Sequence, residues 1–230
     1  MVRNIAMNKK RRKIAENLKG KRKYGAKLPL TLEQYKTIRK LIRGSKQNKY
    51  AARNLLLINF QLNSSFRASD ILSLKIKDIF DNGRYLPEIW RKQQKTKDPN
   101  IIKITPVIIE DLNAAQLAYH DIFMPGYFNN PDLPLFPSKR KNNGKFKALD
   151  YSTYLYYLKG WIAEAGLNPD LYGTHSLRSA IPVDYYSQTG DLLTASHMFG
   201  HLSSATTQIY VNKVAKKKAA DIRELYQFKD

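Results

Sequence analysis

The stretch that most constrains the fold of this chain is residues 48–64, which are helical in pattern but apolar over a wide arc. The residues that make up this arc are Ala51, Leu55, Leu56, Leu57, Ile58, Phe60 and Leu62. A helix with so wide an apolar surface is stable only when other elements cover most of it. We therefore predict a mainly α-helical domain that is built around this segment.

Further helices are predicted on both sides of this segment. Thr31 is expected to cap a helix that ends at Gly44, with Gln34 completing a capping box. Apolar residues at helical spacing predict other helices over residues 109–123, 152–165, 192–199 and 213–230. Asp111 is expected to open the first of these four helices.

Two regions between the helices have a different pattern. Residues 75–80, 85–93 and 101–107 alternate between apolar and polar side chains, which predicts three short strands. Residues 124–144 are rich in Pro and Asn, which predicts a surface loop.

Pro182 locates the start of one more helix. It lies four residues after Arg178, so a helix through both would lack the hydrogen bond to the Arg178 carbonyl. We therefore expect the regular helix to start near Ser179 or Ala180, with Pro182 in its first turn, and to end at Gly190.

Basic residues greatly outnumber acidic ones. The chain has 40 Lys and Arg against 19 Asp and Glu, a formal net charge of +21. This excess is typical of nucleic-acid-binding proteins, although a ribosome-like structural protein or a membrane-surface protein would share it. Residues 1–28 are expected to form a basic arm on DNA phosphates; the alternative is a solvated, disordered tail. The residues expected to contact DNA are Lys9, Lys10, Arg11, Arg12, Lys139, Arg140 and Lys141.

The chain has no cysteine. This composition excludes disulfides, thiolate catalysis, and zinc or iron–sulfur sites with cysteine ligands. No apolar run approaches the roughly 18 residues of a membrane-spanning helix, and no apolar signal core follows the basic start. We expect a cytoplasmic, nucleoid-associated protein.

The segment from Gly173 to Val211 carries the residues that indicate chemistry. His175 and Arg178 are three apart, so one helical turn would place them on one face. His201 follows a glycine, and Tyr210 comes nine residues later. A phenol among cationic and proton-transferring side chains is suited to attack on a phosphate diester.

This pattern resembles the tyrosine recombinase (phage integrase) family, whose signature is H-x-x-R, then G-H, then Tyr. The family's first arginine lies in a segment that matches S-F-R-A-S-D-I-L-S-L-K-I-K-D here, which identifies Arg67. Ser65 replaces the usual small, glycine-type residue. The family's lysine, in a K-T context on a hairpin, matches Lys95, with Lys97 as the alternative. The resemblance covers about residues 29–215.

The resemblance implies a role for each of these residues. Arg67 and Arg178 would bind the phosphate, and His201 would hydrogen-bond one of its oxygens. His175 would accept the proton of Tyr210, which would form a 3′-phosphotyrosine, and Lys95 would protonate the departing 5′ oxygen. No metal ion, ATP or other cofactor is needed.

The resemblance also implies an architecture. It predicts a mixed, mainly α catalytic domain over residues 29–230 with a small antiparallel three-stranded sheet and a docking helix at about 213–230. The short chain resembles the fimbrial-switch invertases. The implied partners are double-stranded DNA, three further copies in a homotetramer on synapsed DNA, and an accessory DNA-bending protein. The alternatives are a catalytically degenerate DNA-binding regulator and a type IB topoisomerase; a metal-dependent nuclease is less well supported, because the carboxylates are isolated.

Overall fold

The computed structural model describes residues 27–45, 48–64, 66–92 and 99–199, together with 205, 207–209, 211, 212, 214–216 and 219. The helices within 27–199 are α2 (Leu32–Gly44), α3 (Ala51–Ser64), α4 (Ala68–Leu72), α5 (Pro106–Ile122), α6 (Tyr151–Glu164), α7 (Thr174–Arg178), α8 (Ala180–Thr189) and α9 (Leu192–Phe199). Short 3-10 helices are η1 (Ile76–Asp78), η2 (Tyr127–Asn129) and η3 (Pro169–Leu171). No helix in these described ranges is long and apolar enough to cross a membrane.

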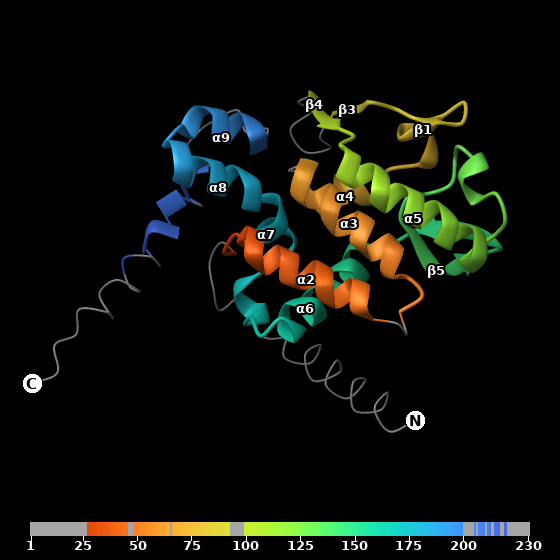
Figure 1. Cartoon of the computed structure of the whole chain (residues 1–230), viewed down its shortest axis with the longest axis horizontal. Coiled ribbons are helices and arrows are strands. Elements are labelled where there is room, and N and C mark those ends of the chain that lie inside the picture. Colours follow the sequence, from red (N-terminus) through yellow and green to blue (C-terminus); the bar gives the residue numbers. More distant parts are fainter. Residues whose placement is uncertain are drawn as a thin grey trace, which may run out of the picture.

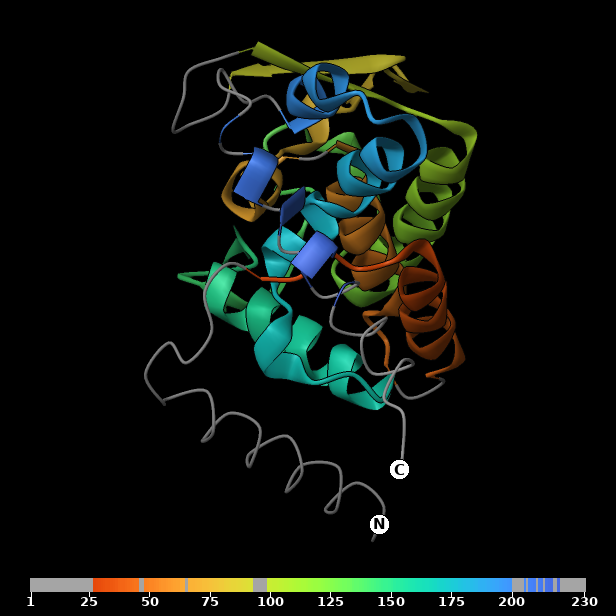
Figure 2. The same cartoon turned by 90° about the vertical axis from the view of Figure 1, so that its left-hand side faces the viewer.

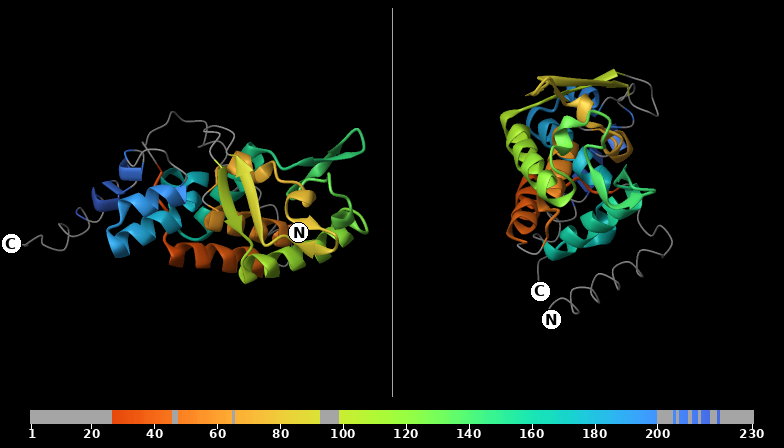
Figure 3. Two further views of the ribbon diagram at one scale, coloured as in Figure 1. Left: turned by 90° about the horizontal axis from the view of Figure 1, so that it is seen from above. Right: turned by 90° about the vertical axis from the view of Figure 1, so that its right-hand side faces the viewer.

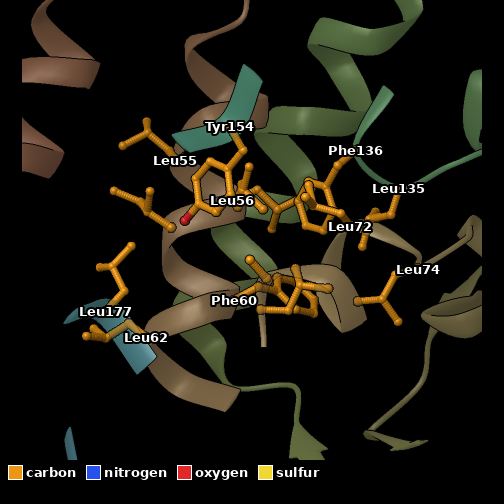
Figure 4. Packing of buried hydrophobic residues seen from close by; sticks show 14 of the residues in the cluster. Leu55, Leu56, Phe60, Leu62, Leu72, Leu74, Leu135, Phe136, Tyr154 and Leu177 are labelled. Atoms are coloured by element: carbon orange, nitrogen blue, oxygen red, sulfur yellow. The ribbon is translucent and has the colours of Figure 1, made fainter. Parts of the chain in front are cut away.

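Helix α3 lies at the centre of the fold, as its wide apolar arc predicts. Helices α2, α5 and α7 all pack against it (Figure 1). Phe60 is fully buried and makes an edge-to-face contact with Phe136, with ring centroids 5.9 Å apart. Figure 4 shows this cluster, with Leu62 of α3 and Leu177 of α7 on the same side of it.

Helix α2 begins as the sequence predicts. The Thr31 hydroxyl accepts a hydrogen bond from the Gln34 amide at 3.2 Å, and the Gln34 side chain accepts one from the Thr31 amide at 3.1 Å. This capping box satisfies amide groups that the first turn leaves without helical partners. The helix then buries Tyr35, Ile38 and Ile42.

A buried polar network joins α2, α3 and α5. Arg39 donates two hydrogen bonds to Asp111, at 2.8 and 3.0 Å. Asn59 donates a third to the same carboxylate at 2.7 Å, and Tyr35 donates to Asn59. The expectation that Asp111 opens its helix is therefore wrong: α5 begins at Pro106, and Asp111 lies in its second turn, where it receives these donors.

The strands form three two-stranded antiparallel sheets in the described chain. They pair as β1 (Phe80–Asp81) with β2 (Arg84–Tyr85), β3 (Glu88–Lys92) with β4 (Pro99–Lys103), and β5 (Pro137–Asn142) with β6 (Lys145–Ala148). The small antiparallel sheets are confirmed, but the expected three-stranded sheet is not observed over the described residues. Residues 76–78 turn into η1 instead of extending a strand, because Asp78 accepts the Lys75 amide and closes the turn.

The predicted surface loop, residues 124–144, contains η2 and the strand β5. Tyr127 and Phe128 of η2 are buried, and Phe123 and Phe146 pack against Tyr127. Aromatic rings remove much apolar surface from water, so this segment folds onto the end of α5. The hairpin β5–β6 follows from it and projects from the body (Figure 3, left).

The C-terminal helices follow the sequence closely. Pro182 lies in the first turn of α8, which starts at Ala180, and Gly190 ends that helix in a left-handed conformation with φ 72°. Helix α9 then packs on α8 (Figures 1 and 2). Of the helix predicted over residues 213–230, only 214–216 and 219 are described, and they are helical.

Candidate active site

Helix α7 is a single short turn that carries both residues of the H-x-x-R motif. The Ser176 hydroxyl accepts the Gly173 amide at 3.0 Å, which closes the N-terminal end. The Ser179 hydroxyl donates to the His175 carbonyl at 2.7 Å, which closes the C-terminal end. Two serines therefore fix the backbone that holds His175 and Arg178.

The segment that leads into the domain lies against this turn. The Leu30 amide donates to the Ser176 carbonyl at 3.0 Å, and the Leu28 amide donates to the Leu171 carbonyl at 2.9 Å. The Tyr151 and Thr174 hydroxyls lie 3.4 Å apart, which links the start of α6 to the start of α7. Leu177 anchors the turn in the core.

The two motif side chains have different environments. Arg178 is buried, and its Nη2 donates a hydrogen bond of 2.7 Å to the carbonyl of Phe199, the last residue of α9. His175 is exposed. Both residues lie on the single turn α7, but the guanidinium is inside the protein and the imidazole is at its surface, so that a common face for the two side chains stays a prediction.

Arg67 is placed by the C-terminal end of α3. It precedes α4 with an extended backbone, φ −67° and ψ 148°, and its carbonyl accepts the Asp70 and Ile71 amides. Its side chain is half-buried. Since α3 packs against both α4 and α7, the segments of the two predicted arginines are attached to the same central helix (Figure 1).

The remaining predicted residues of the site lie outside the described part of the chain. They are Lys95, its alternative Lys97, His201 and Tyr210. The described neighbours show what flanks them: β3 and β4 flank residues 93–98, and α9 ends two residues before His201. Residues 207–209, 211 and 212, on both sides of Tyr210, are helical, and Thr207 and Val211 are buried.

A side-chain hydrogen bond connects that helical segment to α9. The Ser196 hydroxyl donates to the Thr207 hydroxyl at 3.0 Å, and both residues are buried. Neither this pair nor the bond from Arg178 to Phe199 is evident from the sequence. A backbone acceptor has no side-chain signature, and serine and threonine are common in helices that do not contact each other.

The predicted basic loop forms the hairpin β5–β6. Phe146 packs on Phe123 and Tyr127, and the Lys141 ammonium lies 4.3 Å from the Phe146 ring centroid. The lysines exposed on this hairpin are Lys139, Lys141, Lys145 and Lys147. The Arg140 side chain and the arm residues Lys9, Lys10, Arg11 and Arg12 lie outside the described residues.

The base of the hairpin is attached to α3. Buried Arg53 donates from Nη1 to the Pro137 carbonyl at 2.7 Å, and its guanidinium lies over the Tyr50 ring at 4.8 Å. Burial lowers the pKa of Arg53, partly offset by the neighbouring tyrosines. This contact holds the first residue of β5 against the central helix, so the exposed lysines extend from a fixed base.

A helical domain with small antiparallel sheets, and with an H-x-x-R turn packed against its central helix, is the architecture expected of a recombinase catalytic domain. The sequence model of the phage integrase family matches residues 29–217. The chain therefore belongs to the phage integrase family of tyrosine recombinases, as the motif predicts. The resemblance to the short fimbrial-switch invertases stays a prediction.

Curated relatives support this membership. The chain is 30% identical over 207 residues to the tyrosine recombinase XerH of Helicobacter pylori. The aligned region covers 87% of this chain and 53% of XerH. It is 29% identical over 197 residues to the tyrosine recombinase XerD of Rickettsia bellii, covering 83% of this chain and 62% of XerD. The chain thus spans between half and two thirds of the length of these relatives.

Solved structures show the same fold. XerH bound to the palindromic difH substrate in a post-cleavage complex matches with a TM-score of 0.62 and 27% identity, covering 87% of this chain and 54% of that one. A lambda integrase tetramer bound to a Holliday junction matches with a TM-score of 0.54, covering 79% of this chain and 47% of that one. At 20% identity, this second match shows the fold alone.

Proposed function

We propose that this protein is a site-specific DNA recombinase that cuts and rejoins DNA through a 3′-phosphotyrosine at Tyr210. The observation that carries the proposal is the anchored Arg178 of the H-x-x-R turn, attached to the same central helix as Arg67. Family membership supports the same reaction class.

The chemistry follows from the charge of the substrate. A phosphodiester repels nucleophiles, and guanidinium groups offset the charge that grows in the transition state. The bond from Arg178 to Phe199 orients that guanidinium before DNA arrives, and preorganised donors are the most effective ones. Arg67 supplies the second guanidinium.

Proton transfer completes the reaction. A phenol has a pKa of about 10 in water, so Tyr210 needs a proton acceptor, and exposed His175 is our candidate. His201 hydrogen-bonds a phosphate oxygen, and Lys95 protonates the departing 5′ oxygen. The phosphotyrosine conserves the bond energy, so resealing needs neither ATP nor a metal ion.

Several features support DNA as the partner. The net charge is +21, and a lysine-rich hairpin extends from the body. One XerH structure holds its difH substrate, and a lambda integrase structure is a tetramer on a Holliday junction. By analogy, four copies assemble on synapsed DNA, with residues 213–230 docking on a neighbour and a DNA-bending protein assisting. The basic arm over residues 1–28 adds phosphate contacts to the catalytic domain over 29–230, and we place the protein in the cytoplasm, on the nucleoid.

The test works with any target sequence, because the target is selected in the experiment itself. The protein is mixed with a library of duplexes that have a randomised core and a nick. After cleavage the short fragment between the cut and the nick diffuses away, so resealing cannot occur and the covalent product accumulates. Adducts that survive denaturation are recovered and sequenced. We expect one sequence to be enriched, the adduct to persist in EDTA, and Tyr210→Phe to abolish it while Tyr156→Phe, a half-buried tyrosine of α6, does not.

The other outcomes distinguish the alternatives. Sequence-specific binding without any adduct would identify a degenerate regulator. Adducts of all sequences, with relaxation of supercoiled plasmid, would identify a topoisomerase. An adduct that remains in Tyr210→Phe would overturn the assignment of the nucleophile.

A further inference from the structure

The hydroxyl pair of Ser196 and Thr207 is a polar contact inside the buried interface between α9 and the helical segment that contains Thr207. Ser196 is 2% exposed and Thr207 is fully buried, and their oxygens are 3.0 Å apart. A buried hydroxyl that loses its partner destabilises the folded state. The two side chains therefore strongly favour the one arrangement in which they meet.

This pair sets the rotation of the helical segment on α9. Thr207 and Val211, one turn apart, are both buried, whereas Ile209 on the opposite side is 56% exposed. Apolar contacts alone tolerate sliding and small rotations, because they have no directional preference. The hydrogen bond between Ser196 and Thr207 does have a directional preference, so it selects a single register of the helical segment on α9.

The same turn of α9 also binds the arginine of the H-x-x-R motif. Ser196 lies three residues before Phe199, whose carbonyl accepts the bond from Arg178. Thr207 lies three residues before Tyr210 in the sequence. One turn of α9 thus joins the buried arginine to the segment that contains the tyrosine.

We infer that Ser196 and Thr207 are positioning residues, which fix the Tyr210 segment relative to Arg178 and so set the rate of DNA cleavage. This inference rests on the proposed function. The pair acts through the backbone of the segment and does not contact the phosphate. Its loss should therefore slow cleavage of bound DNA without weakening DNA binding.

The experiment compares stability with cleavage in four variants of the pair and one control variant. Thr207→Val and Ser196→Ala each remove one hydroxyl of the pair, the double variant removes both, and Thr207→Ser keeps the pair. Gln208→Ala is the matched control, because it removes an exposed hydrogen bond to Asn212 on the same segment. Single-turnover adduct formation at saturating protein, affinity for the enriched duplex, and the thermal unfolding midpoint are measured for each.

We expect Thr207→Val and Ser196→Ala each to lower the unfolding midpoint and to slow adduct formation by about tenfold. Their affinity for DNA should stay within about twofold of the wild type. The double variant should have a higher midpoint than Thr207→Val, since it no longer buries an unpaired Ser196 hydroxyl, but its adduct rate should stay low. Thr207→Ser and Gln208→Ala should cleave at near the wild-type rate.

Two results would overturn the inference alone. One is an adduct rate in Thr207→Val equal to that of the wild type. The other is a rate that recovers with the midpoint in the double variant, which would show a purely structural role. If the wild type itself forms no adduct, the proposed function fails first, and the inference fails with it.

Discussion

Arg178 and Phe199 are joined by a buried hydrogen bond of 2.7 Å that spans 21 residues of sequence, from the guanidinium of one to the backbone carbonyl of the other. The bond links α7 to the end of α9, directly before the G-H motif. It makes the orientation of a predicted catalytic arginine depend on a helix that carries no predicted catalytic residue. The guanidinium of Arg178 should therefore be sensitive to changes that preserve its charge but alter its shape.

Arg178→Lys should slow covalent adduct formation by about a hundredfold. Lysine retains the charge but lacks the planar fork that can hold a carbonyl and a phosphate together. Affinity for duplex DNA should change only a few-fold. Single-turnover cleavage measures the effect, with Arg43→Lys, at an exposed position of α2, as the control. A lysine variant that cleaves at the wild-type rate would contradict the role of the guanidinium.

Asp111→Ala should lower the free energy of unfolding by about 3–5 kcal/mol. The change leaves the Arg39 guanidinium, whose side chain is only 15% exposed, without its carboxylate, and it removes the acceptor of Asn59. Urea denaturation measures the loss. Glu33→Ala breaks the exposed pair with Lys36 and should change stability by less than about 1 kcal/mol. Equal losses in the two variants would show that burial is not the cause.

Lys159 should make stability depend on pH in the alkaline range. It is 3% exposed, and burial, aided by the nearby Lys27, lowers its pKa to about 8. The unfolded chain holds this proton up to about pH 10, so between about pH 8 and pH 10 it binds more protons than the folded chain. The free energy of unfolding should therefore rise with pH in this window.

Lys159→Met tests that dependence. It should stabilise the protein at neutral pH by at most about 3 kcal/mol and flatten the rise toward pH 10. Urea titrations at several pH values measure both effects, and Lys40→Met on the exposed face of α2 serves as the control. If the free energy of unfolding of the variant still rises in full toward pH 10, a group other than Lys159 is responsible for the rise.

Neutralising the β5–β6 hairpin should reduce the salt dependence of DNA binding. With Lys139, Lys141, Lys145 and Lys147 changed to Gln, the slope of log affinity against log salt should fall by about 0.9 for each phosphate that the hairpin no longer neutralises. Lys75 and Lys77 are the matched controls, because both already pair with Asp132. An unchanged slope in the hairpin variant would place the DNA elsewhere.

The helices could be predicted from the sequence because their signals are local. The capping box of Thr31, the wide apolar arc of α3 and the position of Pro182 each depend on residues within a few turns. The β3–β4 hairpin is also close to its prediction, but the first of the three predicted strands is not observed as such. Residues 75–80 alternate like a strand, but the amide of Ile76 is bound by the Leu133 carbonyl, which is distant in the sequence, and the backbone turns there.

In the candidate site, too, the local features could be predicted and the contacts between distant segments could not. The H-x-x-R spacing predicts one turn for His175 and Arg178, and that turn is observed. The spacing does not predict the bond from Arg178 to Phe199, because a backbone carbonyl is the same in every residue. It does not predict the burial of Thr207 either. Contacts between distant segments fix the orientation of Arg178, and only the folded chain shows them.

The contact between Leu30 and the Ser176 carbonyl has a practical consequence for experiments. Since the Leu30 amide donates to the Ser176 carbonyl, a truncation that removes residues 27–30 takes a backbone hydrogen bond from the turn that bears His175. Such a shortened chain would lose support for this turn and could imitate a catalytic defect. Assays of cleavage are therefore best made with residues 27–30 retained.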